Sequence, residues 1–140
     1  MENDREIIYD VKEKRGMSPG ELEKLLFVWQ KKLGMEDWKF DLRIVGFKRE
    51  NGFRQSGDFI ADVEHKIASI LMTWDPWRGD EEYTLVHELL HVLVYDFDTY
   101  SEGLILKNCK KFEAEHDMYM GKLENLVHHL TKQFLGRSDR

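Results

Sequence analysis

Residues 84–95 read "TLVHELLHVLVY" and form the most apolar run of this 140-residue chain. His87, Glu88 and His91 interrupt the run, and burying such polar groups costs free energy unless they are paired or bind an ion. In an α-helix, residues four apart lie about 40° apart around the axis and about 6 Å apart along it. A helix over this run therefore directs the imidazoles of His87 and His91 to one point and leaves Glu88 beside them.

The sequence on the N-terminal side of this run predicts a first helix. "SPGE" at 18–21 places Ser18 as the N-cap, Pro19 in the first helical position and Glu21 where a capping box needs it. Apolar residues then recur at helical spacing until Gly34, which is the expected stop signal.

Three strands are predicted between this helix and the apolar run. The first alternates apolar and polar residues, which is typical of a half-buried strand, and two further short apolar segments follow a polar stretch. The predicted strands are "WKFDLRI" at 38–44, "DFIADVEH" at 58–65 and "KIASILMTW" at 66–74.

Two helices are predicted in the second half of the chain. The first follows the breaking segment "DPWRGD", with Asp80 as a cap, and runs to about Tyr95. We expect a loop around "DFDTYSEG" at 96–103 and then a helix to about Leu135. The order helix, three strands, helix, helix predicts an α+β fold in which a small antiparallel or mixed sheet packs on helices.

Composition and charge are those of an ordinary soluble protein. Hydrophobic residues make up 41% and charged residues 34% of the 16.8 kDa chain, which predicts one compact domain over residues 1–140. A chain with a net charge of -6 and only scattered basic clusters lacks the basic face that phosphate binding needs, so no nucleic-acid partner is expected. Cys109 is the only cysteine, which excludes an intramolecular disulfide and a thiolate zinc cluster.

The same features predict a cytoplasmic protein. A single cysteine fits a reducing compartment, and the charged stretch "MENDREIIYDVKEKRG" lacks the apolar core of a secretion signal. No segment approaches the roughly 20 apolar residues of a membrane span, so no membrane partner is expected. The sequence does not indicate an oligomeric state.

The polar residues of the apolar run have the spacing of a metal site. Imidazole nitrogens bind zinc at about 2.0–2.1 Å, and His87 and His91, one turn apart, can reach the same ion. Glu88 is offset from both, so it borders the ion and can take a proton from a water that the ion activates. This is the HExxH arrangement, which combines two ligands and a general base on one rigid turn.

"HELLH" at 87–91 resembles the active-site helix of the zincin metallopeptidases, and the helix-then-sheet order before it is similar to their minimal catalytic core. The resemblance implies a Zn²⁺ cofactor, His87 and His91 as metal ligands and Glu88 as the catalytic residue. It also implies that the strand before the active-site helix, here "ASILMTW" at 68–74, lines the cleft and pairs with an extended substrate.

A third protein ligand is expected, because a catalytic zinc has three and keeps an open position for water. Val94 and Phe97 stand where metzincins have a glycine and a third histidine, so the ligand should come from the C-terminal helix. A glutamate, as in gluzincins, is favoured over a histidine, as in SprT-like proteases, because His116 falls within the apolar stripe of that helix. "EAEHD" resembles the ExxxD of thermolysin-like enzymes, with Glu113 as ligand. "ENLVHHL" resembles the ExxVxxL helix of short bacterial and phage zincins, with Glu124 as ligand.

Only one of these glutamates can reach the ion, because they lie about 16 Å apart along one flank of a continuous helix. Glu113 suits a tight helical hairpin with little chain between the two helices. Glu124 suits a longer connection in which residues 97 to about 115 partly cover the site. The glutamate-then-apolar phasing around Val127 and Leu130 favours Glu124.

The expected function is that of a zinc-dependent metallopeptidase acting on a peptide or protein substrate. Glu88 would take a proton from the zinc-activated water and deliver it to the leaving amine. Tyr95, Tyr100 and His128 are further candidates for stabilising an oxyanion, although packing is the commoner role of such residues. The alternatives are a zincin-fold metal-binding regulatory or binding module with little or no turnover, and a structural helix without metal.

Overall fold

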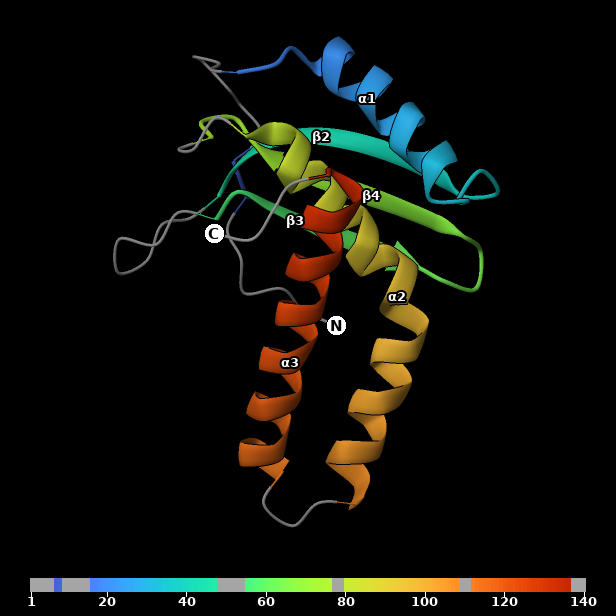
Figure 1. Ribbon diagram of the computed structural model, residues 1–140, viewed down its shortest axis with the longest axis vertical. Helices are drawn as coiled ribbons and strands as arrows, with labels where there is room; N and C mark the ends of the chain where they lie inside the picture. The colour runs from blue at the N-terminus through green and yellow to red at the C-terminus, as the bar shows by residue number, and fades with distance from the viewer. Residues whose placement is uncertain (1–6, 9–15, 48–54, 77–79, 109–111, 137–140) are drawn as a thin grey trace.

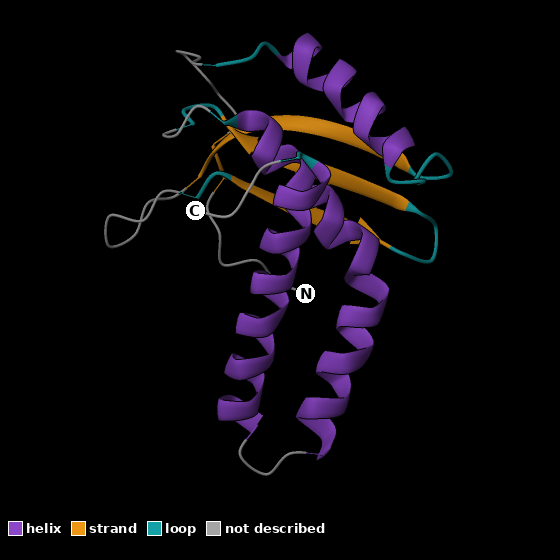
Figure 2. Cartoon of the chain, in the orientation of Figure 1, coloured by secondary structure: helices purple, strands orange, loops and turns teal. Residues whose placement is uncertain are grey.

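The computed structural model describes residues 7–8, 16–47, 55–76, 80–108 and 112–136 (Figure 1). Within them the chain forms three helices and a small mixed sheet, which confirms the α+β fold expected from the sequence (Figure 2). In chain order the elements are β1 (Ile7–Ile8), α1 (Pro19–Lys32), β2 (Lys39–Phe47), β3 (Gly57–Asp62), β4 (Ile67–Thr73), α2 (Glu81–Asn108) and α3 (Phe112–Phe134).

Helix α1 begins as its sequence predicts. Ser18 Oγ accepts a hydrogen bond from the Glu21 backbone N–H at 3.1 Å, and the Glu21 carboxylate accepts one from the Ser18 backbone N–H at 2.8 Å, which completes the capping box. The helix ends just before Gly34, whose φ of +70° is a conformation that glycine adopts without strain. Trp29 Nε1 donates to Glu82 Oε2 at 2.8 Å and ties α1 to the first turn of α2.

The sheet has the strand order β1-β2-β4-β3. β2 and β4 are parallel, whereas β3 pairs with β4, and β1 with β2, in the antiparallel direction. The three strands predicted from the sequence are confirmed as β2, β3 and β4. The short β1 is not predicted, because its two residues lie in a charged segment without an alternating pattern. Among the described strands, β4 lies between β2 and β3, whereas β3 lies at an edge of the sheet.

The main core joins α1, α2 and α3 to one face of the sheet. Figure 1 shows the arrangement of these elements. The strand residues of this core alternate along each strand, as the two-residue period of a half-buried strand requires. These residues are Phe40, Leu42, Ile44, Phe59, Ala61, Ala68, Ile70 and Met72. On the opposite face, Val45, Phe47 and Leu71 form a second buried cluster. None of the described helices is both long and apolar enough to cross a membrane.

Helices α2 and α3 form a long hairpin whose far half extends beyond the sheet (Figure 1). α2 has 28 residues and continues through the segment 96–103, so the loop expected there is wrong. Glycine, serine, threonine and aspartate in that segment cost roughly 0.5–1 kcal/mol each in helix propensity, and contacts with α3 offset this cost. Tyr119 Oη donates to Asp98 Oδ1 at 2.8 Å, and His116 Nε2 lies 2.5 Å from Glu102 Oε2. Burial and the Asp98 carboxylate raise the pKa of Tyr119 to about 12, so its hydroxyl stays a donor at neutral pH.

Candidate metal centre

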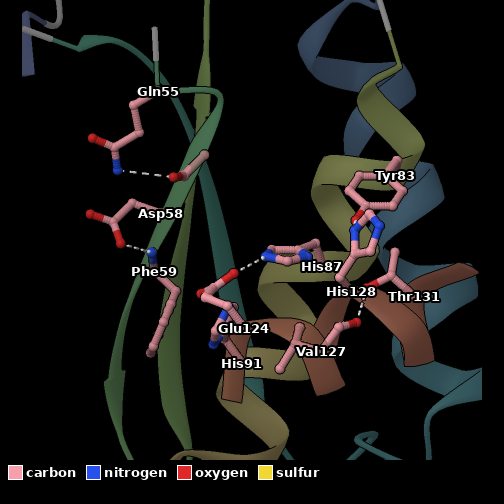
Figure 3. Close-up of polar contacts among 11 residues, drawn as sticks. Gln55, Asp58, Phe59, Tyr83, His87, His91, Glu124, Val127, His128 and Thr131 are labelled. Carbon is pink, nitrogen blue, oxygen red and sulfur yellow. Dashed lines mark hydrogen bonds and ion pairs between the residues drawn. The ribbon is translucent and has the colours of Figure 1, made fainter. Parts of the chain in front are cut away.

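His87 and His91 lie one turn apart on α2, and Glu124 faces them from α3 (Figure 3). His87 Nε2 is 3.3 Å from Glu124 Oε1, and His91 Nε2 is 2.9 Å from Glu124 Oε2. The side chains of His87 and His91 are 16% and 9% exposed, whereas that of Glu124 is 54% exposed. One ligand atom from each residue lies within 4.8 Å of the others, so the three residues are close enough to bind one metal ion.

The donor atoms and their spacing fit such an ion. In a tetrahedral zinc site with bonds of about 2.0–2.1 Å, neighbouring ligand atoms lie about 3.3 Å apart, and each imidazole Nε2 lies at a similar distance from one of the two Glu124 carboxylate oxygens. Hydrogen bonds from His87 and from His91 hold the pKa of the Glu124 carboxyl far below its ordinary range. The carboxyl is therefore ionised at neutral pH, as metal binding requires.

An aromatic ring supports each imidazole of the group. Tyr83 stacks on His87 with ring centroids 5.7 Å apart, and Phe59 of β3 stacks on His91 at 5.5 Å. Tyr95 meets Phe59 edge-on at 5.2 Å, so this sequence candidate for oxyanion stabilisation packs behind the site. His87 Nδ1 is buried and has no hydrogen-bond partner among the described residues. Stacking, rather than the carboxylate or carbonyl acceptor that commonly supports a ligand histidine, orients this ring.

Glu88 is 8% exposed and lies where β3 passes over α2. A Cβ built on Gly57 would lie 2.6 Å from Thr84 Cγ2 and 3.2 Å from Glu88 Oε2. Glycine is therefore the residue that lets the β3 backbone approach the helix this closely. The Glu88 carboxylate is held against β3 and stands outside the group of three ligand atoms.

β3, and not β4, is the strand that borders the site. The segment 68–74 forms most of β4, which is hydrogen-bonded to β2 on one side and to β3 on the other. Both edges of β4 are paired, so the expectation that the segment 68–74 pairs with a substrate is wrong. The strand order instead places Gly57 and Phe59 of β3 against α2.

The structure brings Glu124, and not Glu113, to the two histidines. Contacts of Asp98 with Tyr119 and of Glu102 with His116 show that α3 runs back along α2, which leaves the exposed Glu113 toward the far end of the hairpin. The longer connection expected to accompany Glu124 is wrong, because residues 97–108 and 112–115 are helical. Helix length, rather than a covering loop, decides which glutamate faces the histidines.

A tyrosine–histidine pair lies beside the ligand group. Tyr83 Oη and His128 Nδ1 are hydrogen-bonded, and their rings meet edge-on with centroids 5.6 Å apart (Figure 3). His128 lies one turn beyond Glu124 on α3, and Tyr83 lies one turn before His87 on α2. The sequence singles out His128 but not Tyr83. The four-residue interval between Tyr83 and His87 is the signal that places both on one helix face.

The fold and the ligand group together define a small α+β protein with a candidate metal site of two histidines and one glutamate. Comparison of the chain with models of protein families, with curated proteins and with solved structures finds no significant match. The chemistry of the site carries the functional proposal, because function lies in a site rather than in a fold.

Glu124→Ala is expected to weaken zinc binding much more than Glu113→Ala. Loss of Glu124 removes the carboxylate of the ligand group, so affinity should fall by more than about 100-fold. Loss of the exposed Glu113 should leave zinc affinity unchanged and change stability by no more than ~0.5 kcal/mol. A competition titration of both variants against a chromophoric zinc chelator measures the difference. The reverse order of affinities would assign the third ligand to Glu113.

Proposed function

We propose that this chain is a zinc-dependent metallopeptidase. The observation that carries the proposal is the convergence of His87, His91 and Glu124, with the buried Glu88 carboxylate on the same turn of α2. Two imidazoles and one carboxylate are a known ligand set of catalytic zinc sites, which keep a further position open for water. The exposure of Glu124 leaves one side of the group open to solvent.

We propose zinc as the ion at this site. Calcium and magnesium take oxygen ligands, whereas zinc accepts imidazole and carboxylate together in a tetrahedral arrangement. When bound, zinc supplies a Lewis acid that lowers the pKa of water towards about 7 and polarises a carbonyl group. Tyr83 and Phe59 hold the two imidazoles by stacking, so the ligands need little rearrangement to bind.

Glu88 moves the proton in the proposed reaction. Its carboxylate accepts a proton from the attacking water, whose oxygen forms a bond to the peptide carbonyl carbon. The carbon–nitrogen bond then breaks as Glu88 delivers the same proton to the leaving amine, which regenerates the carboxylate. Glu88 suits this role by position, because it is buried against β3 and lies on the same turn of α2 as the two histidines.

The position of β3 favours an extended peptide as the substrate. β3 has a neighbour on one side only in the described sheet, and an extended peptide can add to such an edge through main-chain hydrogen bonds. A peptide paired with β3 would pass Gly57 and Phe59, the residues that contact α2 beside Glu88 and His91. The proposed substrate class is therefore a peptide or an unfolded segment of a protein.

Cleavage of a peptide library tests this function. The zinc-loaded chain is expected to generate new termini at internal peptide bonds of a proteome-derived library, detected by mass spectrometry. Removal of the metal with a chelator should abolish these products, and added Zn²⁺ should restore them. A chain that binds zinc but leaves the library intact would be a metal-binding regulatory or binding module. Cleavage that survives metal removal would exclude a zinc mechanism.

A further inference from the structure

The C-terminal half of α2 carries four large apolar side chains that are exposed to solvent. Leu93 is 45% exposed, Phe97 70%, Tyr100 68% and Leu104 44%. We call these four residues the α2 stripe. Scattered apolar residues are ordinary on a protein surface, but a contiguous apolar patch usually marks an interaction site.

The α2 stripe points away from α3 and β3. The helix meets α3 through His91 and Asp98, and at about 100° per residue the centre of the stripe lies roughly 140° around the axis from them. Tyr95, which packs on Phe59 of β3, also lies on the α3 side of the helix. Neither element can cover the stripe. Tyr100, a sequence candidate for oxyanion stabilisation, therefore points away from the ligand group.

The stripe continues a heptad repeat that begins in the core. Val86 and Leu90 are 0% and 1% exposed, and they precede Leu93 with the same alternation of four and three residues. This period of 3.5 residues is that of helices that pack against another helix by knobs-into-holes contacts. The first part of the repeat is buried in the domain, while the second part is exposed. The occupant that fits the stripe is thus an α-helix.

The residues of the stripe are arranged symmetrically about its midpoint. Leucine stands at both ends and an aromatic residue at both central positions, with intervals of four, three and four residues. A second copy of α2 laid antiparallel would place Leu93 against the partner's Leu104 and Phe97 against the partner's Tyr100. A two-fold interface needs a self-complementary surface of this kind.

We propose that the α2 stripe is the interface of an antiparallel homodimer, with its two-fold axis between Phe97 and Tyr100. The stripe contains no charged residue. In the antiparallel heptad arrangement the flanking Asp96 falls nearest the partner's Gly103, so no like charges meet there. The stripe and the ligand group lie on different sides of α2, and the dimer is independent of the proposed peptidase function.

The size of the stripe sets the strength of this dimer. An aromatic side chain can bury about 150–250 Å², so the exposed fractions of the four residues amount to on the order of 1,000 Å² over two copies. Stable interfaces bury at least about 1,200 Å², and smaller ones are transient. The expected dissociation constant is therefore on the order of 10–100 µM.

Sedimentation equilibrium of the full chain tests the proposal. The wild type should shift from monomer to dimer between roughly 1 and 1,000 µM. The double variant Phe97→Glu/Tyr100→Glu should raise the dissociation constant by at least about 100-fold. Phe27→Glu alters an aromatic residue of α1 that is 65% exposed, and it should leave dimerisation unchanged. All the substituted side chains are exposed, so circular dichroism should show unfolding temperatures close to that of the wild type.

Disulfide cross-linking tests the antiparallel direction without charged substitutions. In a Cys109→Ser background, a mixture of Leu93→Cys and Leu104→Cys chains should form the mixed disulfide faster than either self-disulfide. A wild type that stays monomeric over the whole concentration range overturns the proposal and leaves the stripe to a helix of another protein. A dimer that the double variant leaves intact, or one in which self-disulfides form first, overturns it as well.

Discussion

His91→Ala is expected to reduce the affinity of the chain for zinc by more than about 100-fold. Loss of a residue that only supports a ligand already costs roughly 10–100-fold in metal affinity, and His91 contributes one of the three ligand atoms of the group. The ion would tie α2 to α3 through Glu124. Thermal stabilisation of the protein by added zinc should therefore disappear together with the affinity.

Elemental analysis of the purified protein and a zinc titration followed by calorimetry measure this effect. His65→Ala is the matched control, because His65 lies between β3 and β4, bonds Asp62 and has a side chain that is 65% exposed. Wild type and the control should each bind about one zinc ion per chain. Equal zinc content in wild type and His91→Ala would refute the metal centre.

Glu88→Gln is expected to retain zinc and to lose peptide hydrolysis by a factor of roughly 10²–10⁴. The amide has nearly the shape of the carboxylate, so its contact with β3 should survive, but it cannot accept a proton at neutral pH. Glu88 lies outside the ligand group, so zinc affinity should stay within a few fold of the wild type. The loss of hydrolysis is measured as the rate of cleavage of the best-cleaved library peptide by the zinc-loaded protein. The zinc affinity is measured by calorimetry.

Glu113→Gln makes the same chemical change at an exposed position of α3 and should leave the zinc affinity and the rate of hydrolysis unchanged. Loss of zinc in Glu88→Gln as complete as that in His91→Ala would make Glu88 a ligand. Hydrolysis by Glu88→Gln at the wild-type rate would remove the general-base role while leaving the metal centre intact.

The turn that carries His87, Glu88 and His91 could be predicted from the sequence because its determinants are local. Helical geometry alone places His87, Glu88 and His91 on one turn, whatever the rest of the chain does. The start of α1 is equally local, since Ser18 and Glu21 satisfy each other's backbone groups within a single turn. Side-chain alternation predicted the strands, because the two-residue period of a strand is a property of its own backbone.

The extent of α2 depended on contacts that local patterns do not encode. The segment 96–103 has the composition of a loop, yet it is helical because Asp98 and Glu102 contact Tyr119 and His116 of α3. Intrinsic propensities of less than about 1 kcal/mol per residue are readily overridden by such tertiary contacts. A helix expected to end near Tyr95 leaves room for a loop beside the site, and the observed length of α2 removes that loop.

Local geometry thus determined that this chain carries a pair of imidazoles and a carboxylate on one helical turn within an α+β fold. Tertiary structure decided which glutamate faces them and which strand borders them. Glu124 meets the histidines through the pairing of α2 with α3, and β3 lies beside Glu88 through the strand order β2-β4-β3. Both arrangements depend on packing between residues that are far apart in the chain. A motif of five residues does not encode such long-range contacts.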